Sequence, residues 1–375
     1  MKTRITIIAA ALGMAAGWAS AQSRSVFEGT AQAFDSTRNG QLLLNVVSQN
    51  FFRNDEYFGD YIEGYTLPGY TLEPSLVYYP TADFSLRAGI SLVQYAGTEK
   101  YSRIVPVVAA DWRFAPDADL IVGCLRANSA HRLPEQLLDE ELQLTSPVEM
   151  GVQCVWTRPH LDADIWLNWQ QFIELGDTIP ERFMAGVRMT FSAGRPDARL
   201  RFEFPTAITV QHIGGQISDY DEPMQSMANG TAGVVLTSGG SGLVSRWHAG
   251  LHAMFYHELT DKKQRPFADG YAICPEAGLT VGCFEAAVGF WHAHDFYACN
   301  GNPLFMSVSS YRPELYRPDR NMLTAQADLV RTIARDLRFS LGAKLYYDTD
   351  RNQTEYYYGL ALVFTPTFRL ATVAR

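Results

Sequence analysis

The sequence predicts an all-β fold, a transmembrane antiparallel up-and-down β-barrel of about sixteen strands. Three observations favour this fold. Apolar and polar residues alternate with a period of two in segment after segment, which indicates strands. Many of these segments are about ten residues or longer, the length that a tilted strand needs to cross a bilayer. Short and long connections also alternate along the chain.

The N-terminus has the pattern of a secretory signal peptide. Lys2 and Arg4 precede an apolar run over residues 5–18, and cleavage is expected before Gln22. No later window offers about 18 consecutive apolar residues, so a helical membrane protein is not expected. Residues 1–21 are therefore excluded from the fold prediction.

The alternation is clearest in four segments, residues 84–92, 161–170, 243–256 and 337–347. In residues 161–170 one face is apolar and the other carries two carboxylates and two amides, which fits lipid on one side and water on the other. Strands of soluble sandwiches average only about five or six residues, so the segment length favours a membrane barrel. Aromatic residues near strand ends fit an interfacial girdle: Tyr78, Tyr79, Trp112, Phe114, Trp156, Phe191, Tyr356, Tyr357 and Tyr358.

Seven short links and eight longer polar stretches separate sixteen predicted strands. The short links are expected at residues 80–83, 115–118, 158–160, 192–197, 238–242, 280–282 and 333–336, and the longer ones at residues 53–64, 97–103, 129–147, 173–181, 213–230, 257–270, 294–320 and 348–354. An even number of strands puts both termini on the side of the short turns. This count assigns the apolar run from Leu304 to Val308 to a loop. Closure is expected because backbone N–H and C=O groups need partners inside hydrocarbon.

Charge and cysteine content exclude several classes of protein. The net charge is -9, and removal of Lys2 and Arg4 with the signal peptide takes it to -9 - 2 = -11, which disfavours nucleic-acid binding. The five cysteines lack metal-ligand spacing and do not form a disulfide framework. Buried thiols are the preferred interpretation, and a cross-strand bridge between Cys124 and Cys154 is the alternative.

With these features, the mature chain resembles the porin-type outer-membrane barrels of Gram-negative bacteria. The resemblance covers nearly all of the mature chain and is architectural, since no family-specific functional motif matches. It implies location in the cell outer membrane, with a signal peptide over residues 1–21, an N-terminal periplasmic segment over residues 22–40 and the barrel over residues 41–375. The chain departs from the many such barrels that end on an aromatic residue, because it ends on Arg375.

The resemblance implies a passive channel for small polar solutes, since sixteen strands leave a lumen wide enough for water. The alternatives are a structural or secretion-associated barrel that acts as a docking scaffold, and a soluble secreted β-protein that binds carbohydrate. Outer-membrane lipid and lipopolysaccharide are the expected surroundings, and the resemblance is compatible with a homo-oligomer. No Gly-x-Ser-x-Gly motif occurs, and residues 239–242 are interpreted as a turn. An enzyme is therefore not expected, and no catalytic residue, cofactor or metal is assigned.

Charged residues that the alternation turns inward are the candidates for setting solute selectivity. They create either a transverse field across the lumen or ion pairs between adjacent strands, and the sequence leaves both interpretations open. For His248 and His252, a hydrogen-bonded wall is preferred over a pH-sensitive patch. The lumen-facing candidates are Glu149, Asp162, Asp164, Arg188, Arg201, Glu203, Arg246, His248, His252, Glu285, Asp328, Arg331 and Lys344.

Three further segments carry candidate binding chemistry. The loop over residues 294–320 is the longest and is expected to fold inward, with Phe305, Met306, Tyr311 and Tyr316 as constriction candidates. The histidine-rich run over residues 291–295 could hold a metal, but a polar strand end is the preferred interpretation. Residues 51–61 mix aromatics with carboxylates, which suits sugar stacking or docking, although packing within the loop is preferred.

Overall fold

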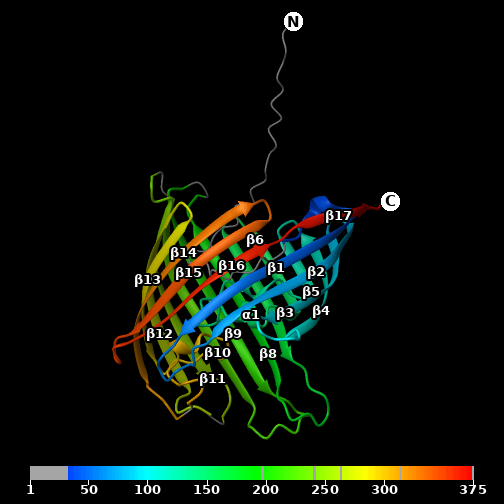
Figure 1. Cartoon of the computed structure of the whole chain (residues 1–375). Coiled ribbons are helices and arrows are strands. Elements are labelled where there is room, and N and C mark those ends of the chain that lie inside the picture. The colour runs from blue at the N-terminus through cyan, green and yellow to red at the C-terminus, as the bar shows by residue number, and fades with distance from the viewer. Residues whose placement is uncertain (1–32, 196–197, 240–241, 262–263, 313, 374–375) are drawn as a thin grey trace.

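The computed structural model describes residues 33–195, 198–239, 242–261, 264–312 and 314–373, so the predicted signal peptide lies outside the described residues. The described chain forms one tilted barrel of antiparallel strands (Figure 1). In the residues that the structure describes, helix is limited to α1 (Leu142–Thr145) and three 3-10 turns, η1 (Ser36–Arg38), η2 (Asn128–His131) and η3 (Pro303–Phe305). No helix in this part of the chain is long and apolar enough to cross a membrane.

Seventeen β elements build the wall. They are β1 (Gln41–Glu56), β2 (Thr66–Thr81), β3 (Phe84–Tyr95), β4 (Arg103–Ala115), β5 (Ala118–Cys124), β6 (Met150–Arg158), β7 (Leu161–Gln171), β8 (Glu181–Ala193), β9 (Leu200–Gly214), β10 (Gln225–Gly239), β11 (Arg246–Glu258), β12 (Asp269–Val281), β13 (Phe284–His294), β14 (Asp319–Ala334), β15 (Leu337–Asp348), β16 (Gln353–Phe364) and β17 (Thr367–Thr372). From β1 to β16 each strand pairs with its neighbours in sequence, and β17 pairs with β1, which confirms the up-and-down topology.

The barrel closes at β1, which pairs with β2 along one edge and with β16 and β17 along the other. β16 and β17 together take the place of one strand, because β16 pairs with residues 48–56 of β1 and β17 pairs with residues 41–45 of β1. Pro366 lies between the two parts, and its carbonyl accepts the N–H of Val46 at 3.1 Å. The wall is therefore a closed sixteen-strand barrel, as predicted.

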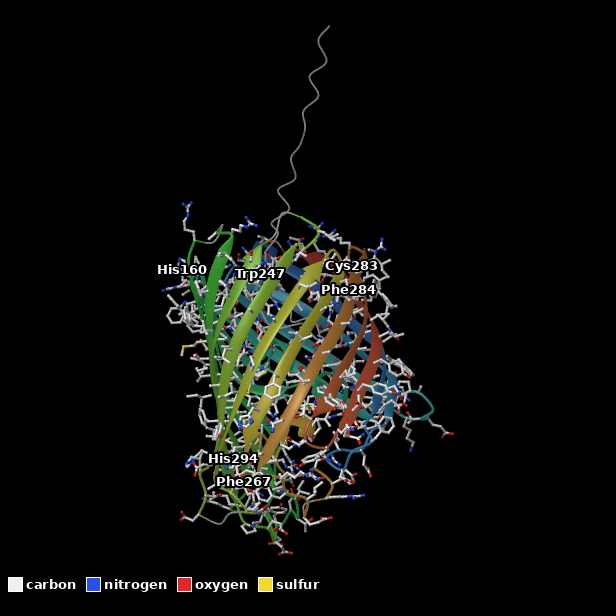
Figure 2. The ribbon with its side chains drawn as sticks, turned by 90° about the vertical axis from the view of Figure 1, so that its left-hand side faces the viewer. His160, Trp247, Phe267, Cys283, Phe284 and His294 are labelled. Carbon is white, nitrogen blue, oxygen red and sulfur yellow. The ribbon has the colours of Figure 1, made fainter. Side chains whose placement is uncertain are left out.

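The alternation of the sequence sets which side chains face lipid. On β8, Met184 and Arg188 point inward and are buried. Val187, Met189 and Phe191 occupy the other set of alternate positions and are exposed on the outer face. Aromatic residues mark both ends of this face. Figure 2 shows the exposed Trp247 and Phe284 near the end with the short turns, and His294 near the end with the long loops, where the exposed Tyr271 lies opposite it. The outer face thus has the apolar band and flanking rings that a bilayer requires.

Two long connections fold into the lumen instead of extending outward, and together we call them the plug: residues 125–149, between β5 and β6, and residues 295–318, between β13 and β14. Trp291, which points inward from β13, contacts Phe296 and Phe305 of the second connection edge-to-face at 5.1 and 5.2 Å. Leu144 of the first connection is completely buried in the same apolar cluster. The predicted assignment of residues 304–308 to a loop therefore agrees with the observed topology.

The two parts of the plug also bond to each other through their backbones. The N–H of Asp139 donates to the carbonyl of Asn300 at 2.7 Å, and the N–H of Asn302 donates to the carbonyl of Glu135 at 2.8 Å. Gly301 is required at this contact, because a Cβ there would lie 2.1 Å from the carbonyl oxygen of Gln136. The two connections therefore form one packed unit inside the outer half of the barrel.

One part of the wall is incomplete. β5 has seven residues and β6 has nine, whereas β4 on one side has thirteen and β7 on the other has eleven. Residues 103–108 of β4 consequently pair with β3 alone, because pairing with β5 begins at Ala109. We call this break in the strand pairing the notch. It lies between β4 residues 103–108 and β7 residues 169–171, and Cys124 and Met150 are the last paired residues of β5 and β6 beside it.

The cysteines are all free thiols, Cys124 and Cys274 being buried. Cys124 lies opposite Met150, and Cys154 lies opposite Leu120. The alternative of a Cys124–Cys154 bridge is therefore excluded by the register of β5 and β6.

Candidate functional site

Several predicted lumen residues meet around a buried histidine of the plug that the sequence analysis did not select. His131 lies with Nε2 2.7 Å from Glu149 and Nδ1 2.8 Å from Asp164. Burial alone would lower the pKa of His131, but Glu149 and Asp164 raise it to about 9. The imidazolium is therefore a structural cation that ties the 125–149 connection to the wall.

Four of the other inward candidates, Arg188, Asp162, Lys344 and Asp328, contact protein groups. Arg188 forms an ion pair with Asp162. Lys344 lies 2.6 Å from Glu135 of the plug, and the amide of Gln326 donates to Asp328 at 2.5 Å. Arg201, Glu203, Arg246, His248, His252 and Glu285 occupy inward positions of their strands. Arg331 differs from the prediction, because it is exposed and lies on the alternate set of β14 positions from Asp328.

The constriction candidates separate into two groups. Phe305 and Met306 are buried in the plug, where Arg320 donates to the carbonyl of Met306 at 2.6 Å. Tyr311 is exposed at its outer surface, where its hydroxyl donates to the carbonyl of Gly59. Tyr316 is partly buried against Phe267, and its hydroxyl donates to Asp295. Of the four constriction candidates, the two apolar residues are therefore the ones that fill the lumen.

Below the plug, on the side of the short turns, lies a mixed polar and apolar cavity of about 350 Å³. Its charged lining includes Glu73 and Arg87, which face each other at 3.4 Å, together with Asp111 and Arg126. Arg87 also donates to the carbonyl of Cys124 at 3.0 Å, where the chain leaves the wall. We call this cavity the vestibule.

The outer face carries a pair of residues with the chemistry of acyl transfer. His212 of β9 and Ser226 of β10 lie directly opposite each other, and the serine Oγ is 2.8 Å from Nδ1 of the imidazole. His212 shares its outward set of positions with Phe202, Phe204 and Ile208, which are exposed to lipid. A hydroxyl hydrogen-bonded to an imidazole is the arrangement that activates a serine nucleophile.

A row of stacked rings leads across the wall to this pair. Trp169 of β7 stacks on Phe183 of β8 at 5.2 Å, and Phe183 stacks on His212 at 4.9 Å. All three side chains point outward near the long-loop end of the barrel, the level of the aromatic girdle. The Ser226–His212 pair therefore lies where lipid headgroups meet acyl chains.

Other outward histidines at this end are held by carboxylates or amides. His257 lies 2.5 Å from Asp269, and His294 lies 2.7 Å from Asp319. His292 bonds Asn321 at 2.8 Å. Within the described ranges, no three histidine, cysteine or acidic residues converge to hold a metal ion.

The closed sheet, the apolar outer band and the long loops at one end define the class of protein, an outer-membrane β-barrel of porin-like architecture. Its structure is similar to that of OprD from Pseudomonas aeruginosa, with a TM-score of 0.53 and 10% identity over 92% of this chain and 97% of that one. OprB from Pseudomonas putida gives 0.52 and 7% over 87% and 94%, and a loop-deletion mutant of OmpT from Vibrio cholerae gives 0.50 and 10% over 90% and 100%. At these identities the likeness shows the fold alone.

The sequence itself identifies a family. The model described as Lipid A 3'-O-deacylase-type matches residues 34–373, so the chain belongs to this family. A comparison with curated protein sequences finds no match. The expectation that the chain is not an enzyme is wrong, because the family is an enzyme family.

The sequence analysis missed the Ser226–His212 pair for a definite reason. It assigned residues 213–230 to a loop, whereas β9 runs to Gly214 and β10 begins at Gln225. The pair forms only through the register of these two strands, so no local motif marks it. The period-two pattern of β9, continued to His212, was the one available signal.

Proposed function

We propose that this protein hydrolyses an acyl ester of lipid A in the outer leaflet, with Ser226 as nucleophile and His212 as base. The observation that carries the proposal is the 2.8 Å contact between the serine hydroxyl and the imidazole on the lipid-facing surface. The family supplies the substrate, since its name specifies lipid A. The plug supports the proposal because it fills the outer lumen and leaves the outer face as the surface in contact with lipid.

The reaction follows from these two side chains. The imidazole tautomer with its proton on Nε2 accepts the hydroxyl proton at Nδ1 while the serine Oγ attacks the ester carbonyl carbon. The ester C–O bond then breaks, the sugar oxygen leaves with the proton from the imidazolium, and an acyl-serine remains. Water hydrolyses the acyl-serine by the same proton path and releases a fatty acid.

The test is deacylation of lipid A by the refolded mature chain in lipid vesicles, followed by mass spectrometry of the lipid. Ser226→Ala and His212→Asn should each lower the rate by at least about a thousandfold, because a nucleophile and its base act as a unit. Ser245→Ala is the matched control: its hydroxyl donates to the carbonyl of Thr280 near the opposite end of the barrel. Unchanged deacylation by Ser226→Ala would rule out this nucleophile.

The second candidate function is passive diffusion of small polar solutes, and the vestibule favours it. This charged cavity of about 350 Å³ reaches from the short-turn side up to the plug, as an inner half-channel would. Planar-bilayer conductance is the measurement. A channel predicts openings in the intact chain and a larger conductance after deletion of residues 296–317. Silence of the intact chain together with large openings of the deletion variant would mean that the plug seals the pore.

A further inference from the structure

The vestibule is bounded by the plug on one side and reaches the short-turn end of the barrel on the other. Residues of the plug, including Gln143 and Pro147, line its upper part. Asp35 and Arg38, which precede β1, line its lower part. Because the short turns of outer-membrane barrels face the periplasm, a periplasmic solute that enters the vestibule does not have to cross the plug.

Positive and negative side chains are balanced around this cavity. Three carboxylates and three guanidiniums line it: Asp35, Glu73, Asp111, Arg38, Arg87 and Arg126. Four of these side chains form pairs with each other, Asp35 with Arg38 at 2.9 Å and Glu73 with Arg87 at 3.4 Å. A lining with equal numbers of both signs is complementary to a solute that itself carries both signs.

The carboxylate of Asp111 is the negative group that has no contact of its own. It lies on an inward position of β4, opposite Ser85 of β3, and is half-buried. Within the part of the chain that the structure describes, it makes no hydrogen bond and no ion pair. Arg126 and Arg87 attract it electrostatically without touching it. A carboxylate inside the barrel is costly without a donor, so this position favours a cationic group.

Arg126 belongs to a group of side chains with the opposite excess charge. Its Nη2 donates to Asp119 at 2.7 Å, and Nε of Arg113 donates to the same carboxylate at 2.7 Å. Because one carboxylate is shared by two guanidiniums, this group is net positive. Asp111 and Arg126 are therefore opposite charges that border one cavity, attract each other and remain apart.

We propose that the vestibule binds a small zwitterion, such as a short amino acid, with its ammonium group on Asp111 and its carboxylate on Arg126. Such a molecule gives both side chains the partner that they lack in each other, through charge-assisted hydrogen bonds that are roughly twice as strong as neutral ones. A cavity of about 350 Å³ has room for a short amino acid together with water.

This inference goes beyond the proposed hydrolysis and does not depend on it, because the Ser226–His212 pair lies on the outer face of β9 and β10. It also requires no conduction through the plug. Equilibrium binding in detergent and conductance in a bilayer measure different properties, so failure of one is distinguishable from failure of the other.

Isothermal titration calorimetry of the refolded mature chain in detergent tests the proposal with three probes of equal chain length. β-Alanine carries both charges at pH 7, propionate carries only the carboxylate, and propylamine carries only the ammonium group. β-Alanine should bind about ten- to hundredfold more tightly than either analogue, the factor that corresponds to one charge-assisted hydrogen bond. Equal binding of β-alanine and propylamine would mean a simple cation site and would overturn the proposal, as would undetectable binding of β-alanine.

Two variants assign the ends of the zwitterion. Asp111→Asn should weaken β-alanine binding at least about tenfold and leave propionate unchanged, whereas Arg126→Gln should weaken β-alanine and propionate and leave propylamine unchanged. Asp83→Asn and Arg158→Gln are the matched controls, because these residues lie at short turns outside the vestibule lining. Equal weakening by Asp83→Asn and Asp111→Asn would indicate general charge attraction and contradict a defined site. The comparison of the three probes uses the unaltered chain, so it does not depend on the folding of a variant.

Discussion

At the scale of single residues, Asp139 of the plug makes the stability of the protein depend on pH. Its carboxyl lies inside the barrel, where burial raises its pKa to about 7 despite the opposing effect of Arg53. Glu141 and Glu135 raise the pKa further. The folded protein therefore holds this proton more tightly than the unfolded chain does, in which an aspartate titrates near about 3.9.

This shift predicts that stability falls with rising pH. Between the unfolded pKa and pH 7, the unfolded chain loses the Asp139 proton first, so each step upward in pH favours unfolding; above pH 7 the effect is constant. Asp139→Asn should flatten this part of the profile and stabilise the protein at pH 8 relative to the parent. Urea unfolding of both proteins from pH 5 to 8 measures the difference. If the free energies of unfolding of the parent and Asp139→Asn changed in parallel with pH, the raised pKa of Asp139 would be contradicted.

Single residues also mark the limit of what the sequence could predict. Alternation alone placed Lys344 and His252 on inward positions, and the structure has them there. It could not predict that Lys344 meets Glu135, because that contact joins residues more than two hundred positions apart. The Ser226–His212 pair was missed because it forms only through the register of β9 against β10, which the sequence of neither strand specifies alone.

At the scale of elements, the unpaired edge of β4 predicts that Pro106→Val destabilises the protein, the opposite of its usual effect in a strand. Replacing a proline in a strand with valine ordinarily favours the strand. At Pro106 the change adds an N–H that faces the notch and has no strand to receive it. Pro106→Val should therefore lower the free energy of unfolding by about 1–3 kcal/mol, the cost of a buried donor without a partner.

The measurement is urea unfolding in vesicles, monitored by tryptophan fluorescence. Cys124→Ala is the companion variant, because it removes the sulfur beside the Val108 N–H and should act in the same direction. Cys154→Ala is the matched control, since Cys154 lies on β6 away from the β4 edge. A stabilised Pro106→Val protein would mean that this edge is not in hydrocarbon.

The elements also show where sequence patterns succeed. Long alternating segments predicted the strands and the even count, because the membrane imposes both length and period. The pattern did not predict the notch or the full plug. The connection over residues 129–147 was expected to be an ordinary long loop, and the choice between an outer loop and an inward fold depends on its burial against distant strands.

At the scale of the whole molecule, the plug joins strands that are far apart in the sequence. Glu135 of the first connection lies 2.6 Å from Lys344 of β15, and the hydroxyl of Tyr346 donates to the same carboxylate at 3.1 Å. The hydroxyl of Tyr357 on β16 donates to Glu140 at 3.0 Å. The first third of the barrel is thereby attached to the last strands through the lumen.

Removing only one partner of the Lys344–Glu135 ion pair should lower the stability of the protein. Lys344→Met leaves the Glu135 carboxylate buried without its cation, and the free energy of unfolding should fall by about 3–5 kcal/mol. The double variant Lys344→Met, Glu135→Gln removes the uncompensated charge as well and should recover most of the loss. Urea unfolding of the two variants provides the comparison. Additive losses in the double variant would contradict a direct pairing.

The same attachment determines how the barrel is made. The connection over residues 125–149 is synthesised early, but its anchors on β15 and β16 arrive last, next to the seam where β16 and β17 meet β1. The inward loop cannot lock until those strands are in place. Completing the seam and fixing the plug in its final position are therefore one late event in assembly.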